Sequence, residues 1–130
     1  MEPEVFSGED LTNLAKEIGV GGKNLLKFEG SKYYIDFVVK DHTKKASELH
    51  EVEDDIYYVI EGEGILSLGG GIEGKRPREG APGHYIGDDL IGATERHLGK
   101  GDLVVIPHGV PHMMDASKSR IVYLVIKEVV

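Results

Sequence analysis

One twelve-residue segment, Gly101–His112 with the sequence GDLVVIPHGVPH, constrains the fold of this chain more than any other. A glycine opens a turn, the apolar run 103–106 has the length and composition of a short β-strand, and Pro107 and Gly109 form a second tight turn. His112 then stands at the start of the next strand. A strand, a tight turn and one imidazole in this order indicate an edge of a small β-barrel, with a candidate ligand directed into it.

A second group of polar side chains lies upstream, at Glu48, His50 and Asp55. Glu48 and His50 are two residues apart, so on a strand their side chains point to the same face. Asp55 begins the next strand after a short turn. If these residues meet His112 inside one barrel, two imidazoles and one or two carboxylates form a site for a divalent metal, for which Fe, Mn, Ni, Co and Zn are all chemically suitable.

Composition sets limits on the class of protein. The 130 residues are enough for one domain with its own core. Fifteen basic against 23 acidic residues give a net charge of −8, which opposes nucleic acids and anionic membranes as partners. The absence of cysteine excludes disulfides and thiolate ligands. With neither a targeting peptide nor a long apolar run in view, we expect a cytoplasmic protein.

The pattern of apolar residues predicts one short helix followed by β-structure. Ser7 resembles an N-cap, and an apolar face repeats at helical spacing over 7–18. We expect strands at 24–29, 33–40, 56–60, 65–68, 103–106 and 121–130, with a turn at 61–64. Because these runs are apolar without alternation, we expect strands that are covered on both faces, as in a sandwich or barrel.

The segment 69–95 differs from the rest of the chain. It holds eight glycines, two prolines and a basic patch of Lys75, Arg76 and Arg78. We expect a glycine-rich surface loop near the barrel mouth, more mobile than the strands, with short hairpin pieces at 85–86 and 93–97.

The two polar segments resemble the motifs of the cupin superfamily. Residues 101–112 fit the second motif, G-x5-P-x-G-x2-H, with Ala116 where an Asn often follows. Residues 48–62 resemble the first motif, H-x-H-x(3,4)-E-x6-G, with Glu48 at the first His, His50 at the second and Asp55 at the Glu. The resemblance implies an all-β fold, a double-stranded β-helix or jelly-roll barrel in a single cupin domain over 1–130. It also implies one divalent metal held by Glu48, His50, Asp55 and His112, and a homodimer formed through the N-terminal strands.

Each proposed ligand has a simpler interpretation. His112 is either a ligand or a barrel histidine hydrogen-bonded to a neighbour, and His50 is either a ligand or a surface histidine beside a turn. Asp55 is either a ligand or a strand-cap carboxylate, and Glu48 is either a ligand or a solvated charge. Two carboxylates make the site more anionic than three histidines and one Glu, and these changes are equally compatible with loss of the metal.

Other residues receive simpler predictions. We interpret Glu51, Glu53 and Asp54 as solvated turn charges. We expect His42, His97 and His108 to have no part in the site, and we consider His84 a possible fifth member that folds over the mouth. By alternation, Tyr57, Val59 and Met114 should pack in the barrel interior.

Two functions remain open from the sequence. The first is a metal-dependent enzyme that performs oxygenase, lyase or isomerase chemistry on a small organic substrate, with unassigned catalytic residues. The second is a non-catalytic cupin that binds a small ligand and holds a structural metal or none. The accessibility of the metal distinguishes them, because a catalytic ion needs an open position.

Overall fold

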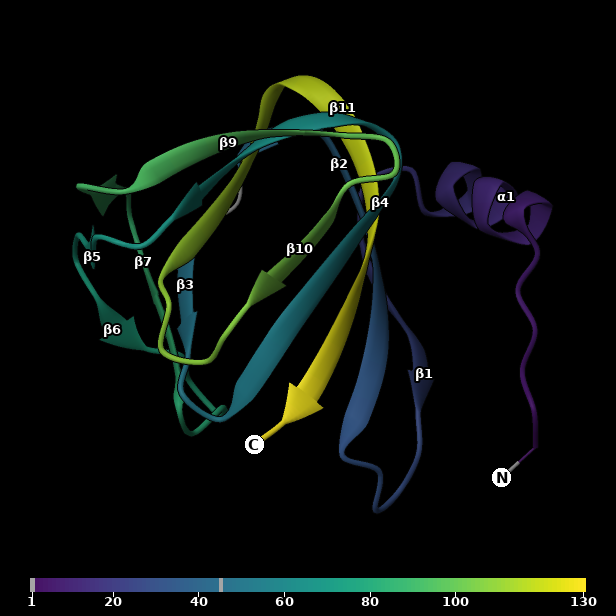
Figure 1. Cartoon of the computed structure of the whole chain (residues 1–130), viewed down its shortest axis with the longest axis horizontal. Coiled ribbons are helices and arrows are strands. Elements are labelled where there is room, and N and C mark those ends of the chain that lie inside the picture. Colours follow the sequence, from purple (N-terminus) through teal and green to yellow (C-terminus); the bar gives the residue numbers. More distant parts are fainter. Residues whose placement is uncertain (1, 45) are drawn as a thin grey trace.

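Long antiparallel strands wrap around a common interior in the computed structural model of this chain, and one helix lies outside them (Figure 1). The structure describes residues 2–44 and 46–130. The elements are α1 (Gly8–Ile18), β1 (Gly21–Lys27), β2 (Tyr33–Lys44), β3 (Ser47–His50), β4 (Glu53–Leu68), β5 (Gly71–Ile72), β6 (Arg76–Pro77), β7 (His84–Gly87), β8 (Leu90–Ile91), β9 (Thr94–Gly99), β10 (Leu103–Ile106) and β11 (His112–Val129).

Strand β11 organises the sheet. It pairs with β2 on one side and with β4 on the other, and its first residue, His112, lies opposite Glu48 of β3. Strands β9 and β10 extend the sheet from β4, while β7 and β6 extend it from β3. This arrangement confirms the predicted all-β jelly roll with one short N-terminal helix, and it brings the two motif segments together at the start of β11.

Two apolar cores lie on opposite faces of β2 and β11. Inside the barrel, Tyr57, Val59 and Met114 are buried as predicted, together with Tyr123. Outside the barrel, Ala15 of α1 packs against the outward-facing side chains of β2 and β11, namely Phe37, Val39 and Val122. The inner face of β2 therefore remains available for polar side chains, because its outer face carries the helix contact.

Helix α1 begins and ends where the local sequence directs it. The Ser7 hydroxyl accepts a hydrogen bond from the Asp10 N–H, and the Asp10 carboxylate accepts one from the Ser7 N–H. This reciprocal capping box satisfies two backbone donors at the helix start. Among the residues that the structure describes, no helix has the length and apolar character needed to cross a bilayer.

Two predictions about β4 are wrong. The turn expected at 61–64 is absent, because β4 continues from Glu53 to Leu68 through a register shift opposite β11. Gly62 makes this possible with a φ of +77°, at a point where a Cβ would collide with the Arg120 carbonyl. The strand is also not covered on both faces, since buried and more exposed positions alternate from Glu53 to Val59.

The segment 69–95 is more regular than a surface loop. Strands β5 and β8 pair with each other, and β6 pairs with β7. Strand β7 pairs in turn with β3, so that His84 lies directly opposite His50. The hairpin pieces predicted at 85–86 and 93–97 coincide with β7 and with the start of β9. The segment contains more paired strand than these two pieces, and its greater mobility stays a prediction.

The Gly62 bulge gives a direct test of this fold. We expect Gly62→Ala to lower the free energy of unfolding by about 2–4 kcal/mol, because alanine would be strained at positive φ and would press on the β11 backbone. Gly99→Ala is the matched control, because a Cβ at Gly99 would meet open space, and it should change stability by less than about 0.5 kcal/mol. Urea denaturation of both variants measures the difference, and equal stabilities would contradict the bulge.

Candidate metal centre

The four side chains predicted as ligands lie together inside the barrel. Strand β3 supplies Glu48 and His50, β4 supplies Asp55 and β11 supplies His112, and all four are buried. The Asp55 Oδ2 atom lies 3.4 Å from the His50 Nε2 atom and 3.5 Å from the His112 Nε2 atom. The Glu48 Oε2 atom lies 3.6 Å from each of the same two nitrogens.

The orientation of both imidazoles is set on the side that faces away from this cluster. His112 Nδ1 lies 3.0 Å from the carbonyl oxygen of Val110. A carbonyl can only accept, so Nδ1 carries the proton and Nε2 presents its lone pair inward when the ring is neutral. His50 Nδ1 lies 2.7 Å from His84 Nδ1. When His50 Nδ1 carries the proton of the neutral ring, His50 Nε2 also presents its lone pair to the cluster.

These inward-facing atoms fit a divalent cation. Among the described residues, His50 Nε2, His112 Nε2 and Asp55 Oδ2 are buried and have no hydrogen-bond partner. Buried polar atoms without partners are costly, so their convergence needs a physical cause. Each imidazole Nε2 atom lies 3.4–3.6 Å from an oxygen of each carboxylate, and the ligand atoms of Glu48, His50 and His112 all lie within 4.8 Å of one another, which is close enough for one ion to contact all three. Nitrogen and carboxylate donors suit zinc and the other borderline metals.

The charges at this centre depend on one another. Burial lowers the pKa of the His112 imidazole, but Asp55 and Glu48 outweigh burial and raise that pKa to about 9. The pKa of His50 is raised by the same balance. Burial raises the pKa of Asp55, but the two imidazoles and Lys127 outweigh it and hold that pKa well below its usual range. A proton on His112 therefore offsets part of the carboxylate charge in the metal-free protein, and a cation can replace it.

A second set of side chains holds Asp55 in place. Lys127 Nζ lies 2.9 Å from Asp55 Oδ1 and 3.3 Å from Glu53 Oε1. The Tyr34 hydroxyl donates to the Glu53 carboxylate, with oxygen separations of 2.9 Å and 2.8 Å. Because Lys127 occupies Oδ1 of Asp55, the other carboxylate oxygen, Oδ2, is directed toward the imidazoles.

We did not predict these supporting side chains from the sequence. The prediction that Glu53 is a solvated turn charge is wrong, because Glu53 is only 4% exposed. Alternation was the available signal, since Glu53 shares its strand face with Asp55 and Tyr57. Lys127 likewise follows Tyr123 and Val125 at two-residue spacing, which places it on the interior face of β11.

Of the remaining histidines, three lie at the surface and one, His84, contacts the cluster through His50. His42, His97 and His108 lie at the surface, with 70%, 66% and 53% of their side chains exposed. His84, the possible fifth member, lies beside His50 but contacts the side of the ring that faces away from the cluster. Its position opposite His50 in the sheet makes it a neighbour that orients the His50 imidazole.

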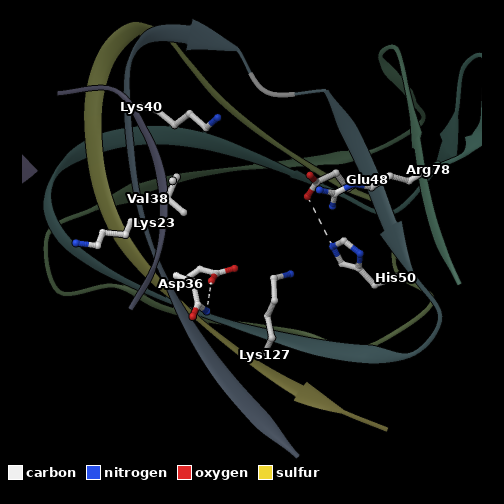
Figure 2. A pocket seen from close by; sticks show the side chains of 10 residues that line it. Lys23, Asp36, Val38, Lys40, Glu48, His50, Arg78 and Lys127 are labelled. Atoms are coloured by element: carbon white, nitrogen blue, oxygen red, sulfur yellow. Dashed lines mark hydrogen bonds and ion pairs between the residues drawn. The ribbon is translucent and has the colours of Figure 1, made fainter. Parts of the chain in front are cut away.

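A pocket of about 390 Å³ opens on one side of the centre (Figure 2). Glu48 and His50 lie in its wall, so the pocket borders this side of the centre. Strands β1, β2, β3 and β11 and the segment after β6 contribute the lining of the pocket. The lining residues are Gly22, Lys23, Asn24, Asp36, Val38, Lys40, Glu48, His50, Arg78 and Lys127.

No protein-family model and no curated protein matches this sequence. Solved structures do match its fold. A cupin protein from Bacteroides fragilis matches with a TM-score of 0.58 and 15% identity over 85% of this chain and 77% of that one. A predicted oxalate decarboxylase from Thermotoga maritima matches with a TM-score of 0.61 and 16% identity over 84% and 79%.

The polyketide cyclase RemF from Streptomyces resistomycificus matches with a TM-score of 0.56 and 19% identity over 82% of this chain and 63% of that one. Together with the strand order and the position of the two motif segments, these similarities show that this chain has the cupin fold. At these identities the comparisons show the fold alone, so the function has to be argued from the site.

The proton balance of the centre predicts opposite pH trends for stability and metal affinity. The folded pKa of His112, about 9, lies above its unfolded value near ~6.5. This stabilisation is therefore complete below about pH 6.5 and is lost as the pH rises through about 9. We expect the free energy of unfolding of the metal-free protein to fall across this window.

Zinc affinity, measured by competition with a chelator, should rise across the same window, because fewer protons compete for the imidazoles. A His97→Gln variant should show both trends unchanged, since His97 is exposed and lies outside the cluster. If neither the free energy of unfolding nor the zinc affinity of the wild-type protein changed between about pH 6.5 and 9, the proposed competition between protons and metal at the imidazoles would be contradicted.

Proposed function

We propose that this protein is a metal-dependent enzyme that acts on a small organic substrate. The observation that carries the proposal is the pair of buried Nε2 atoms directed at two carboxylates beside an open pocket. Glu48, His50, Asp55 and His112 would hold one divalent ion, and Fe, Mn, Ni, Co and Zn remain suitable. When bound, such an ion polarises a carbonyl or carboxylate group, or binds oxygen.

The residues of the chain have separate roles in this proposal. Val110 and His84 orient the two imidazoles, while Lys127 orients Asp55 and offsets its charge. The pocket admits the substrate from the side of Glu48 and His50. Each of these contacts acts before the substrate arrives, and catalysis benefits from such preorganisation because no reorientation is needed during the reaction.

Tyr123 is a further group that the site can use. It is fully buried, and its hydroxyl has no hydrogen-bond partner among the residues described. Burial, with the charges of Glu48 and Asp55, raises the pKa of Tyr123 far above its usual value. The phenol is therefore neutral and able to donate a hydrogen bond.

The alternative is a non-catalytic protein with a structural metal. The burial of Glu48, His50 and His112, whose ligand atoms all lie within 4.8 Å of one another, favours it, because a structural ion is enclosed by protein ligands. The neighbouring pocket favours the enzyme, because a catalytic site needs space for a substrate beside the metal and a structural site does not. The cupin fold itself does not select between them, although a predicted oxalate decarboxylase and a polyketide cyclase share it. Azide should change the visible spectrum of the Co²⁺-loaded protein only if a coordination position is open.

Metal content tests the proposal directly. Protein purified without added metal should carry, or take up, one divalent ion per chain, and the double variant His50→Ala, His112→Ala should bind none at this site. His112→Ala alone should weaken binding more than Glu48→Ala, because the imidazole is the stronger ligand for a borderline metal. The loss expected for His112→Ala is at least about a hundredfold.

His97→Ala is the matched control, since it removes a histidine from the surface. Elemental analysis and competition with a chelator measure the outcome. If the double variant retains metal at the wild-type ratio, the ion is bound elsewhere and the proposed function fails.

A further inference from the structure

The pocket beside the metal centre has a charge opposite to that of the whole chain. The protein carries a net charge of −8. The pocket lining nevertheless contains four cations, Lys23, Lys40, Arg78 and Lys127, against the two anions Asp36 and Glu48. Val38 is its one strongly apolar side chain among the described residues. A pocket of this composition favours a charged ligand over an apolar one.

The charged groups are not all equally available to a ligand. Lys127 already contacts Asp55 and Glu53, and Asp36 accepts a hydrogen bond from Asn24 at 2.9 Å. Within the described part of the chain, Arg78 and Lys23 form no ion pair. Unlike Lys127, these two cations can therefore contact a ligand without giving up a carboxylate partner.

The backbone places Arg78 at the pocket. Its N–H donates to the His84 carbonyl over 2.8 Å, and its own carbonyl accepts from the Ala81 N–H over 3.2 Å. These bonds tie Arg78 to the strand whose His84 touches His50. Figure 2 shows Arg78 on the same wall as Glu48 and His50, while Lys40 and Lys23 lie across the pocket from it.

We propose that this pocket is an anion-binding subsite, and that the substrate is a small dicarboxylate. The proposal rests on the proposed function. One carboxylate of the ligand reaches the metal between Glu48 and His50, and the other is bound by the Arg78 guanidinium, whose planar donors suit a carboxylate. Lys23 and Lys40 add attraction from the opposite wall.

Charge supports the same ligand. A divalent ion with Glu48 and Asp55 forms a neutral centre, so the pocket cations retain their attraction for an anion once metal is bound. The volume of about 390 Å³ is near the lower end for small-molecule sites. The shortage of apolar side chains disfavours a ligand with a long hydrocarbon body. A ligand with two carboxylates joined by a few carbons fits both the small volume and the polar lining of the pocket.

Malonate is the probe for this subsite, and malonamide is its uncharged counterpart. Isothermal titration of the metal-loaded protein should show binding of malonate and binding of malonamide at least about tenfold weaker. Arg78→Gln should weaken malonate binding by about tenfold or more, as expected for loss of a charge-assisted hydrogen bond. Lys23→Gln should give a smaller loss, because a lysine ammonium does not offer the planar pair of donors with which a guanidinium binds a carboxylate.

Arg96→Gln is the matched control, since Arg96 is an exposed arginine outside this pocket. Equal affinities for malonate and malonamide, or an Arg78→Gln variant that binds malonate as the wild type does, would overturn the subsite. The metal-free protein is titrated as well. Malonate binding that depends on Arg78 in a protein that takes up no metal would support the subsite while the proposed function fails.

Discussion

The meeting of two imidazoles and two carboxylates in the barrel interior is the constraint on which the rest of this structure depends. Burying Glu48 and Asp55 without compensating charge would cost several kcal/mol for each. The imidazoles of His50 and His112 supply that charge when protonated, and a divalent cation supplies it when they are neutral. The same arrangement thus offsets the burial of the carboxylates in the metal-free protein and offers donors to a metal.

The architecture brings these groups together from distant parts of the chain. Strand β11 carries His112 and Lys127 at its two ends and pairs with both β2 and β4. Helix α1 covers the outer face of β2 and β11, which leaves the inner face of β2 to carry Asp36, Val38 and Lys40 into the pocket. The segment after β4 contributes through His84 and Arg78, so its glycine-rich turns position two side chains at the site.

Much of this could be predicted from spacing. The motif around His112 predicted the turn, the strand and the inward imidazole, and two-residue spacing predicted that Glu48 and His50 share a face. Glu53 was missed because it sits in an acidic run that resembles solvated charge. Lys127 was missed because it lies in a strand that is apolar on both faces, so only alternation with Tyr123 reveals the direction of its side chain. The course of β4 through Gly62 was also missed, because a glycine with positive φ is equally compatible with a turn and with a bulge. Contacts such as that between His84 and His50 depend on strand pairing, which the local sequence does not specify.

Anomalous X-ray scattering from crystals grown with a divalent transition metal tests the central claim most directly. The account predicts one strong peak inside the barrel, about 2.1 Å from the Nε2 atoms of His50 and His112, with carboxylate oxygens of Glu48 and Asp55 completing the protein ligands. A peak confined to surface histidines such as His97, with the interior cluster held together by protons alone, would contradict it.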